Sequence, residues 1–507
     1  MIDTSKSILD VTDRDTEIPS PEESVSLGAS GCVLLVLSLL SAALFSFGHD
    51  WMSPSFHGPG IGLTVTHLIM TISVISTAIK RKQLRLSLPG IFLLFLSVLL
   101  SLTYAVFANP AMKRLNLPIL WLLTAHALFT LTGMNHNPAL SGKGVWEGIQ
   151  RYWKSLFRHW KTPFQSLAEK AHSTSRFSRS LLPGIALALI VSITAAYLLA
   201  AADQVFFSIL SGAVHSIAHI NFSSVLQILL TLLLTLILFS HHFSLLQRPE
   251  TIRPVRVRAT DPTIFCLVLI GLALVYALFS YVQVRYLFAG VESVRMSGGY
   301  AAYARSGFFQ LVAVALLTLS IILPALTLFR EKRSVRILCA ITALLTVIID
   351  ISAFMRMRLY TQTFGLSTLR IVTLWGIAII MLALLAVLGK TIRPEFQICP
   401  VLAVIILSSW VALNWINMDR VVADDLVSRY NKGAKGPDSI QTLASDQYWS
   451  PDYYAAFQNI ADPQARRDAV ELLDIRAHEV QSDGRFLNDP SLYDWSLSFL
   501  HNGTATQ

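Results

Sequence analysis

Residues 371–389 read IVTLWGIAIIMLALLAVLG, nineteen residues without a charged side chain. A helix of this length crosses the roughly 30 Å hydrocarbon core of a bilayer and satisfies its own backbone hydrogen bonds there. Similar apolar runs recur along the chain, in which 53% of residues are hydrophobic and only 14% are charged. Soluble domains carry about 25% charged residues. The sequence therefore predicts an all-α polytopic integral membrane protein.

Eleven segments are long and apolar enough to be predicted as transmembrane helices. Four of them precede a long polar loop, 134–180, within residues 30–133, and seven follow it within residues 181–417. The predicted spans are residues 30–47, 61–79, 88–107, 116–133, 181–201, 222–246, 263–288, 303–329, 335–355, 365–388 and 398–417.

Lysine and arginine residues concentrate in alternate connections between these spans. The N-terminal tail and the connections on its side hold 24 of them, whereas residues 48–60 and 202–221 on the other side hold none. Cytoplasmic loops keep an excess of positive charge, so the N-terminus is predicted inside and, after eleven spans, the C-terminus outside. Because the net charge of +9 follows topology, we expect no nucleic-acid partner.

Three polar segments lie outside the spans. Residues 1–29 are acidic and predict a disordered cytoplasmic tail. The cytoplasmic loop 134–180 contains VWEGIQRYWKSLFRHW (145–160), which predicts a basic amphipathic helix on anionic lipid, with a regulatory partner site as the alternative. Residues 418–507 hold eight basic and fourteen acidic residues and predict an acidic, helical, extracytoplasmic tail.

Metal ligation is weakly indicated. His215 and His219 are four residues apart and would share a helix face, but Ser216 stands where a metalloprotease has glutamate. Interfacial polarity is therefore the favoured interpretation of the pair. The four cysteines lie singly in apolar runs and form no C-x-x-C motif. We expect no metal site and no cofactor.

Arginine, tyrosine and glutamine residues collect at the outer ends of four consecutive spans, from 263–288 to 365–388. Arginines there oppose the inside bias, so they are not topology signals. A guanidinium group binds phosphate or carboxylate at two points, and phenols add hydrogen bonds. The candidate ligand-binding residues are Tyr281, Gln283, Arg285, Tyr300, Tyr303, Arg305, Asp350, Arg358, Tyr360 and Arg370.

A structural interpretation of the same residues stays open. Arginines near helix ends extend toward lipid headgroups. Asp350, the single acidic residue inside the predicted spans, can form an ion pair with one of them, and a proton-carrier role is the less favoured alternative.

Four motifs resemble an uncharacterised bacterial family. They are YVQ (281–283), YAAYARSGF (300–308), FGLSTLR (364–370) and RYN (429–431). Over about residues 180–500 the chain resembles the multi-pass membrane proteins grouped as domain of unknown function (DUF) 4173, related to the 4153 group. The resemblance implies a bacterial inner-membrane protein and a role for the outer motifs, supplies no activity, and is weak after residue 432.

Two classes of function follow. The first is an outward-facing cavity that binds an anionic lipid headgroup or lipid-linked phosphate for envelope transport or modification. The alternative is a non-enzymatic scaffold or sensor that acts through the acidic tail and the basic loop. Ion-coupled transport is disfavoured because acidic residues are almost absent from the spans. The sequence leaves open whether the protein is an enzyme, and it indicates no partner beyond membrane lipids.

Overall fold

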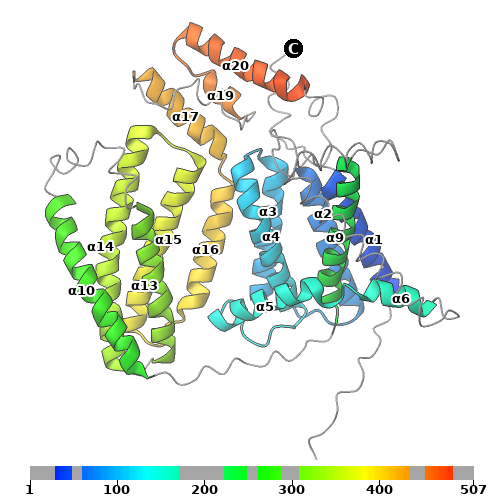
Figure 1. Cartoon of the computed structure of the whole chain (residues 1–507), viewed down its shortest axis with the longest axis horizontal. Helices are drawn as coiled ribbons and strands as arrows, with labels where there is room; N and C mark the ends of the chain where they lie inside the picture. The colour runs from blue at the N-terminus through cyan, green and yellow to red at the C-terminus, as the bar shows by residue number, and fades with distance from the viewer. Residues whose placement is uncertain are drawn as a thin grey trace, which may run out of the picture. The chain divides into compact units, whose positions relative to one another are not determined.

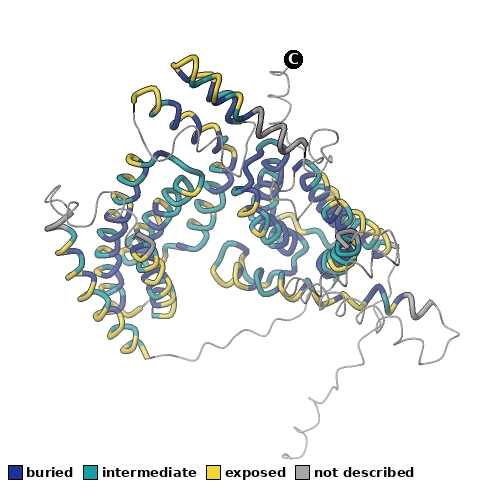
Figure 2. The backbone as a smooth tube through the Cα atoms, turned by 45° about the horizontal axis from the view of Figure 1, so that its top comes forward, coloured by how far each residue is buried: buried dark blue, intermediate teal, exposed yellow. Residues whose placement is uncertain are grey.

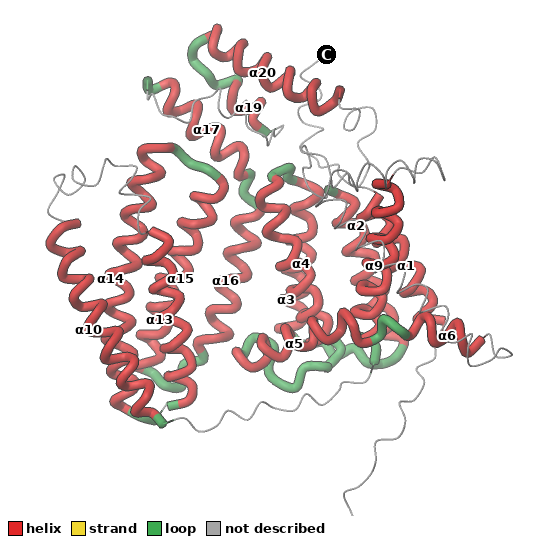
Figure 3. The backbone as a smooth tube through the Cα atoms, viewed as in Figure 1, coloured by secondary structure: helices red, strands yellow, loops and turns green. Residues whose placement is uncertain are grey.

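The computed structural model describes residues 29–47, 60–170, 222–247, 261–287, 308–329, 331–433 and 452–482. Within these ranges the chain is helical and no residue lies in a strand (Figure 3). This confirms the all-α class. The predicted span 181–201, the His215–His219 pair and most of the N-terminal tail lie outside the described residues.

The chain divides into two compact units that interleave along the sequence. Unit 1 comprises Met1–Ala43 and Lys154–Ser244, and unit 2 comprises Leu44–Trp153 and Leu245–Gln507. Unit 1 contains most of α1 (Ala29–Phe47), the end of α5 (Gly142–Arg158), α6 (Thr162–Lys170) and α9 (Phe222–Ser244). In this unit Ser240 Oγ donates a hydrogen bond to the Ser155 carbonyl oxygen (2.7 Å) and accepts one from His159 N (2.9 Å). These bonds attach the last turn of α5 and the residue that follows it to α9.

Unit 2 holds the remaining helices and the candidate sites (Figure 1). They are α2 (Ile61–Lys80), α3 (Leu88–Val106), α4 (Pro110–Leu131), α10 (Pro262–Leu287), α13 (Phe308–Leu328), α14 (Arg333–Phe364), α15 (Thr368–Ile392), α16 (Ile398–Asn414), α17 (Met418–Asn431), α19 (Tyr453–Phe457) and α20 (Pro463–Ser482).

Eight helices of the described ranges are long and apolar enough to cross a membrane. The number is nine if α16 and α17, which meet at a bend of 64°, form one broken span. Many residues of these helices are exposed (Figure 2). On α10, for example, Leu274 is 69% and Leu278 is 68% exposed. So large an exposed apolar surface is unfavourable in water, whereas the hydrocarbon core of a bilayer solvates it. The protein is therefore a multi-pass membrane protein whose helices contact lipid.

The ends of several helices differ from those that hydropathy predicts, most clearly in α4 and α14. The predicted span 116–133 begins earlier, at Pro110, because Asn109 caps the helix by accepting a hydrogen bond from Met112 N (2.9 Å). The predicted span 335–355 continues nine residues further as α14, to Phe364. It ends at Gly365, whose φ of +79° and ψ of −179° stop the helix. Hydropathy registers apolar length and not these backbone signals.

Side chains of unit 2 pack into separate apolar cores. One joins α2, α3, α4 and α16, and a second joins α10, α13, α14, α15 and α16. A third core joins α17, α19 and α20 through residues such as Phe457 and Leu473, both fully buried. The α3–α4 turn, the α14–α15 turn and the α16–α17 bend lie at the same end of unit 2, next to α17 (Figure 1).

Candidate functional site

None of the predicted ligand-binding residues lines the pocket that the described residues form. Tyr300, Tyr303 and Arg305 lie outside the described residues, as does the side chain of Arg285 on α10. The others whose side chains are described lie on three helices: Tyr281 and Gln283 on α10; Asp350, Arg358 and Tyr360 on α14; and Arg370 on α15.

Arg370 closes the turn between α14 and α15. Its Nη1 donates hydrogen bonds to the carbonyl oxygens of Phe364 (2.9 Å) and Gly365 (2.8 Å). Its guanidinium carbon lies 4.6 Å from the centre of the Tyr360 ring, and Nη2 is 3.4 Å from the Tyr360 hydroxyl. A cation at the C-terminus of a helix neutralises its last carbonyls. The geometry thus gives Arg370 a structural role and brings Tyr360 beside it.

The remaining predicted residues lie apart from this turn. Gln283 Oε1 accepts hydrogen bonds from Ser352 Oγ (2.9 Å) and from Arg356 Nη2 (3.4 Å), so it links α10 to α14. Tyr281 is 60% exposed, and Arg358 is also exposed. Asp350 is buried within the membrane-spanning part of α14.

Two residues of α17 hold the α14–α15 turn from the other side. We call Asp425 and Arg429 the α17 clamp. Arg429 donates to Asp425 Oδ2 (2.8 Å) and to the carbonyl oxygens of Gln362 and Thr361 (2.7 Å each). Asp425 Oδ2 also accepts a hydrogen bond from Leu366 N (2.8 Å). The clamp therefore binds both the last carbonyls of α14 and the backbone that follows.

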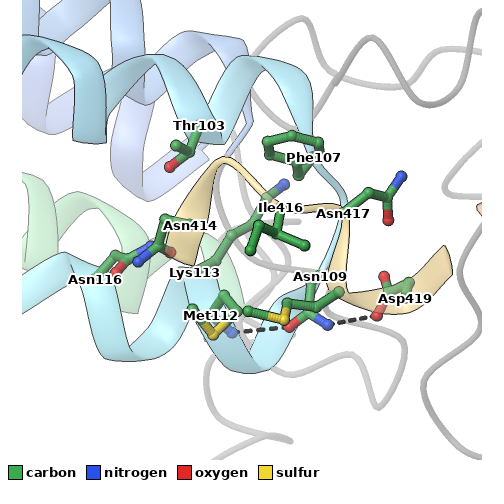
Figure 4. A pocket seen from close by; sticks show the side chains of 11 residues that line it. Thr103, Phe107, Asn109, Met112, Lys113, Asn116, Asn414, Ile416, Asn417 and Asp419 are labelled. Atoms are coloured by element: carbon green, nitrogen blue, oxygen red, sulfur yellow. Dashed lines mark hydrogen bonds between the residues drawn. The ribbon is translucent and has the colours of Figure 1, made fainter. Parts of the chain in front are cut away.

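A polar pocket lies between the α3–α4 turn and the α16–α17 bend. Asn109 Nδ2 donates to Asp419 Oδ1, which joins α4 to α17 (Figure 4). It also donates to Thr368 Oγ1 (3.1 Å), at the start of α15. Lys113, on the same side of α4, lines the pocket. Eleven residues line it: Thr103, Phe107, Asn109, Met112, Lys113, Asn116, Asn414, Ile416, Asn417, Met418 and Asp419.

The base of this pocket is a buried amide network. Asn116 Nδ2 donates to Asn414 Oδ1, and Asn116 Oδ1 accepts from Trp410 Nε1 (3.0 Å). Asn414 Nδ2 in turn donates to the Trp410 carbonyl oxygen (2.8 Å). The space open to the centre of a water molecule is about 20 Å³. It has room for on the order of one water or one terminal oxygen of a ligand.

Sequence reasoning missed this pocket, although one signal was present. Lys113 was visible as a positive residue on the predicted outer side, against the inside bias, and Asn109 and Asn116 flank it near one face of a helix. The opposite wall, Asn414 to Asp419, comes from about 300 residues further along the chain. Hydropathy says nothing about which distant helices pack together.

The first turns of α5 anchor the chain after α4. Glu147 is buried, and Arg151 Nη2 donates to its Oε1 (2.9 Å). Glu147 also accepts hydrogen bonds from His136 N (3.0 Å) and from Asn137 N (3.1 Å). Burial alone would raise the pKa of Glu147, but these hydrogen bonds outweigh it and hold the pKa at about 2. Trp146 and Trp153, seven residues apart, are each 59% exposed on the same helix.

Among the described residues no three histidine, cysteine or acidic side chains come close enough to hold a metal ion.

Comparison with protein families matches residues 94–457 to a family described as "Domain of unknown function (DUF4153)". The matched segment runs from α3 to the end of α19 and includes both the polar pocket and the α17 clamp. The motifs of the sequence resemble the DUF4173 group, and the match carries the label of the related 4153 group instead. No curated protein and no solved structure matches the chain.

Proposed function

The chain belongs to the DUF4153 family. For this member of the family we propose a membrane scaffold whose helices α17, α19 and α20 bind a protein partner. The family description names no activity, so the proposal rests on geometry. The observation that carries it is the α17 clamp, which attaches these three helices to the turn between α14 and α15.

The clamp is strong for its size. Arg429 makes a charge-assisted bond to Asp425 and two more to backbone carbonyls, and its side chain is only 26% exposed. Hydrogen bonds to charged groups contribute about 1.5–3 kcal/mol each when buried, and partial exposure lowers that value. These hydrogen bonds hold α17 against the α14–α15 turn, so they favour one fixed position of α17 over a loosely attached tail.

A second attachment holds the other end of α17. Asp419, in its first turn, is buried and accepts a hydrogen bond from Asn109 on α4. Asn109 also reaches Thr368 at the start of α15. With both ends bound, α17 serves as a rigid base for the helices that pack on it.

The surface that these helices present is polar. Ala469 and Leu473 of α20 are buried against α17 and α19. The opposite face of α20 exposes Gln464, Arg467, Asp468 and Glu471 at helical spacing. A mixed-charge helix face lies in water and not in apolar lipid, so it is open to a protein partner outside the bilayer. On the proposed topology, with the N-terminus in the bacterial cytoplasm, this face lies outside the inner membrane.

The test is site-specific photo-crosslinking in living cells. A photoreactive residue at Glu471 should give the same discrete protein adduct in the wild type and in Arg420→Ala, because Arg420 forms only an exposed pair, 3.7 Å from Asp424. Arg429→Ala should lose the adduct while its membrane helices stay folded. An adduct that survives Arg429→Ala, or no adduct in the wild type, contradicts the proposal.

The polar pocket favours a second candidate function, which we propose separately. It is recognition of an anionic lipid headgroup or lipid-linked phosphate for envelope transport or modification. Lys113 and the amide group of Asn417 could donate hydrogen bonds to one oxygen of such a group. The small volume admits the terminal oxygen only, and the rest of the ligand would stay outside.

Native mass spectrometry of the detergent-purified protein tests this candidate. A specific anionic lipid should remain bound to the wild type and to the double variant Arg285→Ala/Arg370→Ala, and should be lost from Lys113→Met. Circular dichroism checks that each variant is folded. If Lys113→Met retains the lipid, the pocket is not the binding site. If only the double variant Arg285→Ala/Arg370→Ala loses the lipid, the outer arginines bind it instead.

A further inference from the structure

A carboxyl group lies in the middle of the membrane-spanning helix α14. Asp350 is 1% exposed. Neither of its oxygens accepts a hydrogen bond from any residue in the described ranges, and no ion pair among those residues includes it. A buried ionised carboxylate without a partner has a high free-energy cost, and the cost is larger still at membrane depth.

The helices packed against α14 supply no opposite charge in their spanning parts. They are α10, α13 and α15. No charged residue occurs in residues 262–283, 310–328 or 371–389 of these helices. The titratable groups there are Cys266, Tyr276 and Tyr281. The Tyr276 hydroxyl accepts a hydrogen bond from Thr318, and Tyr281 is exposed on the outer face of α10.

Charged side chains of α14 itself lie toward its ends. Arg333 and Arg336 belong to its first turn. Arg356 is six residues beyond Asp350 on another face, where its Nη2 donates to Gln283. Arg358, eight residues beyond Asp350, is exposed. The other titratable groups of the helix are Cys339, which is buried in the apolar core three turns before Asp350, and Tyr360, which lies beside Arg370 near the C-terminal end.

Hydroxyl groups form a stripe with Asp350. Thr342, Thr346 and Asp350 are spaced by four residues and are all buried. Thr346 donates to the Thr342 carbonyl oxygen (2.7 Å), and its hydroxyl lies 3.4 Å from that of Thr318. The interior of this helix group therefore contains a line of polar atoms next to the carboxyl, although its surroundings are apolar.

We propose that Asp350 is a reversible proton-binding site inside the membrane part of the protein. The ligand is a single proton: one carboxylate oxygen takes it up, and the side chain changes from a charge of −1 to neutral. The resting protein holds the protonated form, because the neutral acid needs no counter-ion. This inference does not depend on the proposed scaffold function or on the polar pocket.

Infrared difference spectroscopy of the full chain in lipid nanodiscs tests the proposal. At neutral pH the wild type should show the carbonyl stretch of a protonated carboxyl group, shifted in deuterated water. The band should be absent from Asp350→Asn, shifted in frequency in Asp350→Glu, and unchanged in Asp424→Asn, whose carboxylate is exposed. Its intensity should fall as the pH is raised.

The alternative to a protonated Asp350 is an ionised Asp350 that forms an ion pair with an arginine. The same variants distinguish these two states. For a neutral acid, Asp350→Asn preserves shape and charge, so its melting temperature should stay within about 2 °C of the wild type. A large loss of stability or a failure to fold would mean that the negative charge is needed, which overturns the proposal. A band that Asp350→Asn leaves intact, or one that no pH removes, also overturns it.

Discussion

Acidification should weaken the junction between α4 and α5 through one carboxylate. Glu147 accepts hydrogen bonds from the backbone of His136 and Asn137 and pairs with Arg151, and its pKa is lowered from 4.5 to about 2. A depressed folded-state pKa adds stability that is complete above the unfolded value, near pH 4.5, and is lost as the pH falls through 2. The shift corresponds to about 3 kcal/mol, of which about 2 kcal/mol is already lost at pH 3.

The assay compares denaturant unfolding of the wild type and Glu147→Gln in the same detergent at pH 7 and pH 3. Because glutamine does not ionise, the difference between the two proteins isolates this carboxylate from all others. We expect the wild type to be more stable by about 3 kcal/mol at pH 7 and by about 1 kcal/mol at pH 3. Asp424→Asn, at an exposed position, is the control and should show almost no difference at either pH. A wild-type advantage over Glu147→Gln that stays constant between the two pH values refutes the reasoning.

Three further substitutions test the packing around the α14–α15 turn and the polar pocket. Gly365→Ala should lower the free energy of unfolding by about 1–3 kcal/mol, because the backbone of Gly365, with φ +79° and ψ near 180°, is open to glycine alone. The control is Gly376→Ala, whose added carbon has nothing within 4 Å and which should be neutral or stabilising. Thermal denaturation measures both. Arg370→Lys loses the planar fork that holds two carbonyls and should lower stability by about 1–2 kcal/mol, while exposed Arg358→Lys should leave the melting temperature unchanged. Asn414→Ala leaves a buried amide donor on α4 unsatisfied and should cost about 1–3 kcal/mol in a denaturant titration; equal stability to the wild type would contradict the network.

The membrane class was predictable from the sequence because it depends on local properties. A run of about twenty apolar residues predicts a spanning helix wherever it occurs in the chain. Helix ends were less predictable, because they depend on single backbone signals such as the Asn109 cap and the positive φ of Gly365. Those signals extend α4 and α14 past their apolar residues, so that polar side chains such as Lys113 become helical.

The candidate sites were only partly predictable, because side chains have roles set by distant neighbours. The sequence shows that Arg370 is a positive residue on the predicted outer side of the membrane. It does not show that Arg370 donates hydrogen bonds to the carbonyl oxygens of the turn just before it. Asp419 and Asn109 are separated by 310 residues, and their contact follows from the packing of α17 on the α3–α4 turn. No periodicity within one segment contains that information.

The interleaving of the two units has a consequence for biosynthesis. Leu34, Ser38 and Ala42 form a fully buried stripe on α1, at intervals of four residues. The rest of unit 1 begins only at Lys154, after residues 44–153 of unit 2. At about 5–20 residues per second, the ribosome needs roughly 5–20 s to produce that intervening segment. During that time the first helix lies without the rest of its unit, and a chain arrested at residue 153 would present this stripe to quality control without residues 154–244.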